Sequence, residues 1–340
     1  MYKLLRPLLF MLAPEKAHAL IVFILQIPCF AFLLGKFCSV ENRKLERTVF
    51  GLKFKNPVGF AAGFDKNALV FNKLGRMGFA FVEIGTVTPK AQPGNPRPRS
   101  FRLKKDCALI NRMGFNNDGL DAIAKRLKGK RKRLIVGGNI GKNTAVANTD
   151  AVSDYLEVFC GLYDYVDYFT VNVSCPNVCN LQQLQDKDEL ARLLKALVDE
   201  RRARQVYRPV LVKISPDLSF QQIDDAIEIA KSMEIDGIVA VNTTNSRAGL
   251  ATEAAEIARI GGGGLSGKPL TDRALEIVRY IVQKTEGKLP VIAVGGIMSV
   301  ADAMNMFNAG ASLIQLYTGY IYQGPALAGK IQRALLKSDN

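Results

Sequence analysis

The residues with the clearest chemical potential lie in the segment FTVNVSCPN, at positions 169–177. Its apolar, β-branched start predicts a buried strand, and polar side chains follow at the carboxyl end. Cys175 is the candidate reactive group, because a cysteine thiolate is a nucleophile and a base. Asn172 and Asn177 flank it and could orient a planar ligand over the sulfur. The alternative for this segment alone is a strand-to-loop turn around an inert, buried cysteine.

Seven further apolar segments share the pattern of this strand, and helix-like stretches separate most of them. The eight predicted strands are 58–62, 81–84, 134–138, 169–173, 210–214, 237–241, 291–294 and 313–316. Helical patterns between them include 188–204, 220–233, 272–284 and 300–309. Eight β-then-α units predict a (β/α)8 TIM barrel, with a doubly wound open sheet as the alternative. The long gap at 86–133 is expected to hold an insertion over the catalytic face.

Hydrogen-bonding or cationic groups lie at the carboxyl ends of the first six predicted strands. The residues at these ends are Ala62, Gly63 and Lys66, then Thr86, Asn139, Asn172, Lys213, Asn242 and Thr243, and all but the first two have polar or charged side chains. Because a parallel barrel gathers these strand ends on one face, we expect one shared site. The small residues before Lys66 let a flat ring approach the backbone, and the lysine offers a positive charge beside it. Each end taken singly could also be a solvated turn.

Glycines in the loops after the last two strands predict a phosphate site. Gly295 and Gly296 follow the seventh strand, YTG (317–319) follows the eighth, and a glycine-rich loop at 261–267 precedes a predicted helix. Barrels commonly cradle a phosphate there with backbone N–H groups, so a phosphorylated cofactor is expected. A Rossmann dinucleotide site is disfavoured, because no G-x-G-x-x-G follows the first strand. The segment NRMGFN (111–116) adds two amides and a cation that suit an anionic planar ligand.

Composition narrows the class of partner. Lysine and arginine outnumber the acidic residues 46 to 31, giving a net charge of +15, which favours a phosphate, an anionic lipid surface or nucleic acid. Nucleic acid is the weakest of these, because no nucleic-acid-binding signature is present and the basic run 125–133 is better interpreted as a solvated helix end. Scattered cysteines and a single histidine predict neither a disulfide framework nor a metal site.

An uncharged and largely apolar run, 17–35, precedes the barrel. Pro28 divides it into two short halves with basic residues on both sides, which predicts a pair of interfacial amphipathic helices. A true membrane span, core helices and an uncleaved signal-like segment are the alternatives. We expect residues 1–40 to form a membrane-associated extension and residues 41–340 to form the barrel domain, with 41–50 as the linker.

Seven motifs, in order along nearly the whole chain, resemble the dihydroorotate dehydrogenase family. They are AAGFDK (61–66), NRMGFNN (111–117), VNVSCPN (171–177), VNTT (241–244), GGLSG (263–267), VGGI (294–297) and YTG (317–319). The extension with PEKAHAL, and Arg102 in PRPRSFRL, resemble the membrane-associated, quinone-reducing class 2 enzymes.

This resemblance implies an FMN-dependent barrel of pyrimidine biosynthesis. Such an enzyme oxidises (S)-dihydroorotate to orotate and passes the electrons to a membrane quinone. It implies an N-terminal helical lid with a quinone tunnel, and peripheral association with the cytoplasmic side of a membrane, the cell membrane in a bacterium. The oligomeric state is left open, a monomer included.

The resemblance also implies a role for each matching residue. Cys175 would be the catalytic base, and His18 and Arg102 would lie near the quinone opening. FMN would be held by Ala62, Gly63, Thr86, Asn139, Asn172, Lys213, Thr243, Gly267, Gly296, Tyr317 and Thr318. The substrate would be held by Lys66, Asn111, Arg112, Met113, Gly114, Phe115, Asn172, Asn177, Asn242 and Thr243.

Several positions depart from the class 2 pattern, among them the loop residues VCN at 178–180. Cys175 stands where class 2 enzymes have serine and soluble class 1 enzymes have cysteine, and Val178 replaces a threonine often found in class 2. A soluble-type enzyme that uses fumarate or NAD is therefore one alternative. The other, outside the family, is a flavin-free barrel that binds a phosphorylated metabolite at a membrane. Flavin absorbance of the purified protein would distinguish that second alternative.

Overall fold

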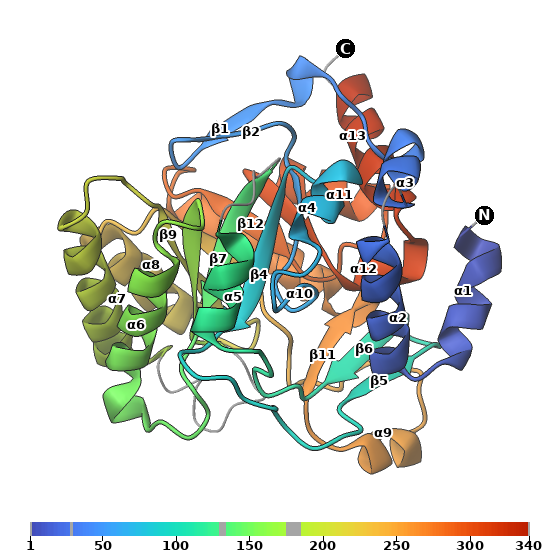
Figure 1. Cartoon of the computed structure of the whole chain (residues 1–340), viewed down its shortest axis with the longest axis horizontal. Helices are drawn as coiled ribbons and strands as arrows, with labels where there is room; N and C mark the ends of the chain where they lie inside the picture. Colours follow the sequence, from blue (N-terminus) through green and yellow to red (C-terminus); the bar gives the residue numbers. More distant parts are fainter. Residues whose placement is uncertain (1, 28–29, 129–133, 175–184, 339–340) are drawn as a thin grey trace.

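The chain folds into a closed barrel of eight parallel strands. Figure 1 shows barrel strands in the middle of the molecule with helices around them. The computed structural model describes residues 2–27, 30–128, 134–174 and 185–338. The barrel strands are β3 (Val58–Phe60), β4 (Phe81–Val87), β7 (Ile135–Ile140), β8 (Tyr168–Asn172), β9 (Val210–Ile214), β10 (Gly237–Ala240), β12 (Val291–Val294) and β13 (Leu313–Leu316). Because β13 pairs with β3, the predicted barrel is confirmed and the open sheet is excluded.

Helices cover the outside of the barrel and bury one apolar face each. They are α4 (Phe71–Arg76), α5 (Leu120–Leu127), α6 (Ala151–Leu162), α7 (Lys187–Arg202), α8 (Phe220–Ser232), α10 (Thr271–Lys284), α11 (Val300–Asn308) and α13 (Ala326–Ser338). In α7, buried leucines at 190, 193, 194 and 197 follow the helical period. Ser219 and Gln222 form a capping box that begins α8. The helices predicted from periodicity are therefore found within two residues of their expected ends.

A hairpin of β1 (Arg47–Val49) and β2 (Leu52–Phe54) covers the end of the barrel opposite the strand carboxyl ends. Phe54 packs edge-on against Phe81 of the barrel interior, with ring centroids 5.2 Å apart. Gly59 has to be a glycine here, because a Cβ would lie 2.3 Å from the Phe81 ring. The segment 41–50, which was expected to be a linker, contains a short 3-10 helix (Arg43–Leu45) and the strand β1.

The insertion after β4 forms a small sheet of its own. Strands β5 (Ser100–Leu103) and β6 (Ala108–Asn111) pair antiparallel, and β11 (Gly264–Gly267) adds to β6. The stretch 264–267, expected to be part of a loop, is therefore a strand that draws its backbone hydrogen bonds from the insertion. In this register Gly264 lies opposite Asn111, which places the start of the NRMGFN segment beside the glycine-rich loop.

Three helices precede the barrel: α1 (Tyr2–Met11), α2 (Pro14–Gln26) and α3 (Phe30–Cys38). The sequence predicted two of them, separated at Pro28, and missed α1, which contains Pro7. These three helices are blue in Figure 1: α1 contacts the short helix α12 (Thr318–Gln323), α2 contacts β5, and α3 packs against α4 and α13. None of the helices in the described ranges has the length and apolarity that a membrane crossing requires.

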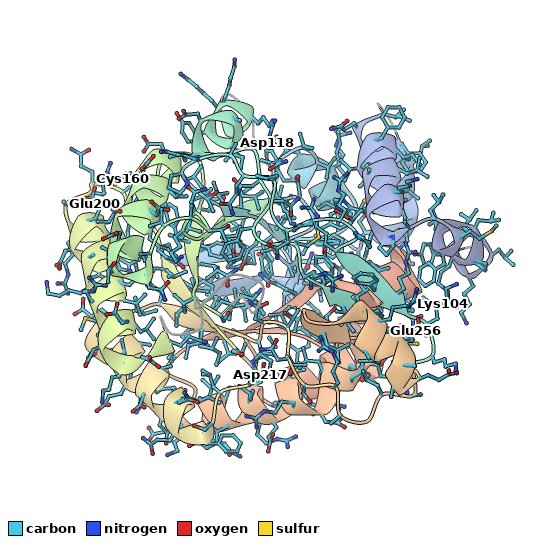
Figure 2. All side chains as sticks on the ribbon, turned by 90° about the horizontal axis from the view of Figure 1, so that it is seen from below. Lys104, Asp118, Cys160, Glu200, Asp217 and Glu256 are labelled. Carbon is cyan, nitrogen blue, oxygen red and sulfur yellow. The ribbon has the colours of Figure 1, made fainter. Side chains whose placement is uncertain are left out.

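Charged side chains populate the outer surfaces of the helices, as Figure 2 shows from below. Cys160 of α6 lies beside Glu200 of α7, and burial together with this carboxylate raises the pKa of the thiol. Cys38, Cys107 and Cys160 are free thiols. The other three cysteines lie outside the described residues.

A buried ion pair joins the end of α7 to the start of β10 and gives a test of the fold. Arg201 donates to Asp236 at 2.6 Å, with side-chain exposures of 3% and 13%. Asp236→Ala would leave the guanidinium buried without its counter-ion, so unfolding by urea should show a loss of about 3–5 kcal/mol. The matched control is Arg202→Met, which removes an exposed pair with Glu234 and should change the free energy of unfolding little. Equal losses in both variants would contradict this account.

Candidate active site

A single cavity of about 940 Å³ runs from the carboxyl ends of the barrel strands to the inner faces of α1 and α2. Most of the predicted site residues line it. These are His18, Ala62, Gly63, Lys66, Thr86, Arg102, Asn111, Met113, Gly114, Phe115, Asn172, Lys213, Asn242, Thr243, Gly267, Gly296, Tyr317 and Thr318. Cys175 and Asn177 lie outside the described residues. Residues separated by almost the whole chain thus share one cavity.

The floor of the cavity is a network of buried amides and hydroxyls from neighbouring strands. Thr86 Oγ1 donates to Asn139 Oδ1 at 2.6 Å, and Asn172 Nδ2 donates to both residues at 3.0 and 3.2 Å. Asn242 Nδ2 donates in turn to Asn172 Oδ1 at 3.3 Å. Asn139 does not line the cavity and is fully buried just beneath this floor. The network holds the cavity amides in fixed orientations, as recognition of a planar polar ligand requires.

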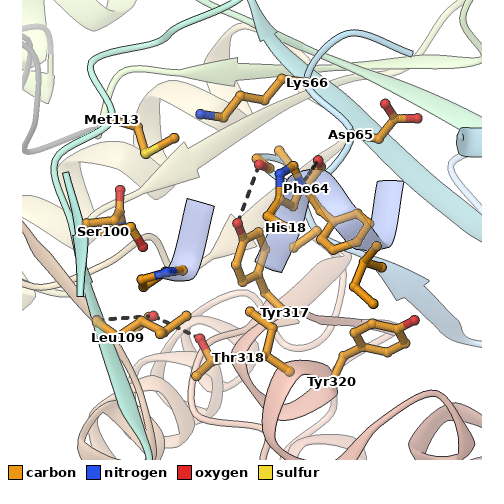
Figure 3. A pocket seen from close by; sticks show the side chains of 18 of the residues that line it. His18, Phe64, Asp65, Lys66, Ser100, Leu109, Met113, Tyr317, Thr318 and Tyr320 are labelled. Atoms are coloured by element: carbon orange, nitrogen blue, oxygen red, sulfur yellow. Dashed lines mark hydrogen bonds between the residues drawn. The ribbon is translucent and has the colours of Figure 1, made fainter. Parts of the chain in front are cut away.

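Lys66 and the inserted segment lie next to each other in the cavity wall. Lys66 Nζ donates to Asn116 Oδ1, and Figure 3 shows Lys66 and Met113 on the same side of the opening. Asp65 fixes the turn that carries the lysine, because its carboxylate accepts from the backbone N–H groups of Leu69 and Val70 at 2.7 and 2.8 Å. Asn116 also lines the cavity. It was not among the predicted site residues, although it belongs to the same sequence motif.

Arg112 does not line the cavity, unlike its neighbours in the chain. Its guanidinium donates to the carbonyl oxygens of Ile260, Gly262 and Pro98, and it stacks over the Phe101 ring at 4.8 Å. These contacts join the insertion to the end of α9 (Ala254–Ile260). The arrangement supports a structural role, and it does not support the expected substrate contact.

The glycines of the predicted phosphate loops leave bare backbone at the cavity wall. Gly296 has a φ of 68°, and a Cβ there would lie 2.3 Å from Thr271 Cα. Gly267 has a φ of 101°, and a Cβ would lie 2.4 Å from the Cys107 carbonyl oxygen. Thr318 Oγ1 lies 2.8 Å from Ser266 Oγ in the same wall. Bare backbone with two hydroxyls and no nearby acid in the lining fits the phosphate of a cofactor.

Aromatic side chains separate this polar region from the N-terminal helices. His18 Nε2 donates to the Phe64 carbonyl oxygen at 2.8 Å, and the two rings meet edge to face at 4.9 Å. Tyr317 donates to the Gly63 carbonyl oxygen at 3.4 Å, and burial raises its pKa to about 12. Figure 3 shows His18, Phe64, Tyr317 and Tyr320 grouped together beside the cavity. This part of the lining is therefore largely apolar and uncharged.

Arg102 borders the same apolar end and holds α1 in place. One of its terminal nitrogens donates to the Leu12 carbonyl oxygen at 2.5 Å, and its guanidinium lies 4.6 Å from the centre of the Phe10 ring. Its Nε is buried and has no hydrogen-bond partner among the described residues. A buried donor of this kind suits a ligand that brings an oxygen acceptor.

Comparisons with known proteins agree along nearly the whole chain. The family model described as dihydroorotate dehydrogenase matches residues 44–338. The dihydroorotate dehydrogenase (quinone) of Christiangramia forsetii is 50% identical over 343 residues, covering 99% of this chain and 99% of that protein. That of Natronomonas pharaonis is 46% identical, covering 99% and 94%. The crystal structure of DHODH from Eimeria tenella with ferulenol is similar at a TM-score of 0.85 and 35% identity, covering 95% and 91%.

The single histidine allows a direct test of the electrostatics of the cavity. Burial lowers the pKa of His18 from its ordinary value of 6.5, and the positive charge of Lys66 lowers it further. The unfolded chain therefore binds the proton at a higher pH than the native protein does. The contribution of His18 to the free energy of unfolding should be present above pH 6.5 and should fall as the pH drops through the lowered native pKa.

Nuclear magnetic resonance of the imidazole can measure this pKa without assignment, because the chain has one histidine. We expect a midpoint below 6.5 in the native protein and a higher midpoint in Lys66→Met, which removes the nearby positive charge. A midpoint at or above 6.5 in the unmodified protein would show that His18 is more solvated than the structure indicates.

Proposed function

The chain belongs to the dihydroorotate dehydrogenase family, and we propose that it oxidises (S)-dihydroorotate to orotate in pyrimidine biosynthesis, with a quinone as the final electron acceptor. The observation that carries this proposal is the continuous cavity, which joins a polar floor to an apolar opening between the N-terminal helices. A polar, anionic substrate suits the first part, and an apolar electron acceptor suits the second.

FMN is the proposed cofactor, and when bound it supplies the hydride acceptor and the electron carrier. The backbone at Gly267 and Gly296, with the hydroxyl of Thr318, would hold its phosphate. Ala62 and Gly63 present little side chain toward the cavity, so a flat ring could approach their backbone. The remaining proposed contacts come from the polar floor and its surroundings, and they are Thr86, Asn172, Lys213, Thr243 and Tyr317. Asn139 was expected to contact FMN as well, but it lies beneath the floor, so we propose that it acts through its hydrogen bonds with Thr86 and Asn172.

The substrate would bind between the polar floor and the inserted segment. Lys66 is placed to pair with the substrate carboxylate, since it lies on the cavity wall and a desolvated ammonium binds an anion strongly. Asn111, Asn172 and Asn242 line the same region and would hold the ring amides through paired donors and acceptors. Asn177, outside the described residues, is proposed for the same role.

Cys175 is the proposed catalytic base, which would remove a proton from C5 of the substrate while hydride leaves C6. It follows directly after Ser174, which is buried beside Asn172 at the carboxyl end of β8. A thiol has an ordinary pKa of about 8.5, far below that of a serine hydroxyl, so a nearby positive charge makes the thiolate available near neutral pH. Lys66 and Lys213, which both line the cavity, are candidates for that charge.

The N-terminal helices are proposed to form the quinone opening and the membrane-binding surface. Most of the large hydrophobic side chains exposed in the described structure lie between Leu4 and Leu33, with Leu4 80% exposed and Phe23 64% exposed. Arg102 and His18 lie at the inner end of this region, and Arg102 Nε would donate to a quinone oxygen. Residues 1–40 would thus act as the membrane-associated lid, and residues 41–340 as the FMN-binding catalytic domain.

This exposed apolar surface supports peripheral association with a membrane. We propose that the protein lies on the cytoplasmic side of that membrane. The basic residues of this surface include Lys3, Arg6 and Lys16, which suit anionic lipid headgroups. The soluble-type alternative, with fumarate or NAD as acceptor, has no need of such an apolar surface. The two curated relatives described above are both named as quinone enzymes. Cys175 and Val178 nevertheless make a direct comparison of acceptors worthwhile.

Stopped-flow reduction of the bound flavin by dihydroorotate tests the proposed chemistry. The purified protein should be yellow, and dihydroorotate should bleach it. Lys66→Met should weaken dihydroorotate binding by about 10- to 100-fold, because the substrate anion loses a charged partner. The Cys175→Ala variant should still bind FMN. Dihydroorotate should reduce that FMN about 10² to 10⁴-fold more slowly, which is the usual contribution of a general base.

Lys73→Met on α4 is the matched control, since that lysine does not line the cavity and its loss should leave flavin reduction unchanged. A colourless protein would support the flavin-free alternative. Unchanged rates in Cys175→Ala would assign the base to another residue, and unchanged binding in Lys66→Met would remove that lysine from the site.

The apolar surface can be tested without removing the helices. The double variant Leu4→Glu, Leu8→Glu should bind vesicles containing anionic lipid more than about tenfold more weakly, because two exposed leucines no longer enter the interface. Reduction of a quinone dissolved in the vesicles should fall in parallel, whereas reduction of a soluble dye should persist. Val206→Glu, at a side chain 54% exposed on another surface, is the control. Undiminished vesicle binding in the double variant would exclude this docking surface.

A further inference from the structure

A fully buried carboxylate lies inside the barrel, beneath the floor of the cavity. Glu83 extends from β4, and its side chain has no solvent exposure. Donors from three other strands surround it. Tyr168 and Thr170 hydroxyls donate to Oε1 at 3.2 and 3.0 Å, Gln315 Nε2 donates to Oε1 at 2.7 Å, and Asn139 Nδ2 donates to Oε2 at 3.2 Å. The reaction proposed above has no use for this acid.

The four hydrogen-bond donors around Glu83 are all neutral groups, and burying an acid among them is costly. No lysine or arginine in the described part of the chain forms an ion pair with it. In all four hydrogen bonds an oxygen of the Glu83 carboxylate is the acceptor. Burial, followed by the charge of Glu83, raises the pKa of Tyr168 well above its ordinary value. An apolar side chain would avoid the cost of burying a charge, so the acid has to be explained by its effect on its neighbours.

The carboxylate fixes the direction of the hydrogen bonds in the floor. Because Glu83 only accepts, Asn139 must turn its Nδ2 toward it and its Oδ1 toward Thr86 and Asn172. Asn172 then donates with Nδ2 and offers its Oδ1 to Asn242. Asn172 and Asn242 line the cavity. The orientation of both cavity amides therefore follows from an acid that does not itself line the cavity.

Gln315 supplies a second, independent observation. Its Nε2 is held by Glu83, so its Oε1 is the amide atom left for another partner. This oxygen is buried and has no hydrogen-bond partner among the described residues, although Gln315 borders the cavity. A buried acceptor without a donor is costly unless a ligand or an ordered water supplies one.

We propose that Glu83 is a positioning residue for the cofactor, in that it fixes the donors and acceptors of the cavity floor through Asn139 and Gln315. This inference rests on the proposed function, because it assumes that the ligand on the floor is FMN. The buried negative charge also opposes further negative charge in the cavity above it. Glu83 would thus affect both the affinity for the flavin and its reduction potential.

The substitution that tests this is Glu83→Gln, which keeps the shape and removes the charge. The new amide can donate, so Asn139 is free to reverse and the floor loses its single orientation. After removal of the flavin, fluorescence titration with FMN should show affinity weakened by about 10- to 100-fold, the scale of a lost hydrogen bond to a charged group. The midpoint potential of the bound flavin should rise, since an anion beneath it has been removed.

Two further variants separate positioning from packing. Glu83→Asp keeps the carboxylate, so the midpoint potential of the bound flavin should stay close to that of the unmodified protein. Tyr168→Phe removes one neutral donor and should lower stability without raising the potential. If Glu83→Gln kept the unmodified affinity and potential, or if Tyr168→Phe raised the potential as much, the proposal would be overturned.

Gln315→Met provides a test that does not depend on the folding of Glu83→Gln. It removes the unpartnered oxygen and leaves the carboxylate, so FMN affinity should again fall. An unchanged affinity would overturn the proposal even if Glu83→Gln did not fold. Failure of the proposed function would be recognised separately, because the unmodified protein would then bind no FMN.

Discussion

The pairing of the last barrel strand with the first is the interaction on which the rest of the structure depends. Backbone bonds from Ile314 to Pro57 and from Ala61 to Leu316, 2.9 and 3.1 Å long, close the sheet into a ring. Closure brings Tyr317 within hydrogen-bond distance of Gly63, 254 residues away in the chain. Without closure, the loop after β13 and the turn that carries Lys66 would lie at opposite edges of an open sheet, and no common cavity would exist.

The N-terminal helices depend on a different kind of contact. Much of their contact with the barrel is apolar, but Glu15 at the start of α2 accepts from Arg99 at 2.8 Å, and Arg99 is only 5% exposed. Arg99 also donates to the carbonyl oxygens of Pro93 and Asn95, in the insertion that carries the substrate segment. Moving α2 away would leave a buried guanidinium without its carboxylate, which is strongly unfavourable. The N-terminal helix α2 and the insertion after β4 are therefore held by the same arginine.

Sequence patterns predicted the barrel well, because each strand is buried on both faces and each covering helix carries its own apolar period. Most of the residues that they assigned to the site also line the cavity, since polar groups at strand ends have few structural uses. What they missed depends on contacts between distant segments. Strand β11 exists because β6 offers it an edge, and Arg112 turns away because carbonyl groups near residue 260 receive it. Glu83 gave no local signal, since a single acid in an apolar strand reveals nothing of the donors that surround it.

The division of one cavity into a polar and an apolar part has a physical reason. In the proposed reaction the anionic substrate and the apolar quinone exchange electrons with the same cofactor. Each of the two needs a different environment. The polar floor is oriented before any ligand arrives, so binding there requires little rearrangement. At the other end, burial lowers the pKa of His18 and raises that of Tyr317, so both side chains are neutral near pH 7. An opening lined mainly by apolar and neutral side chains lets an apolar molecule enter while displacing little tightly held water, and Arg102 is a charged group at its border.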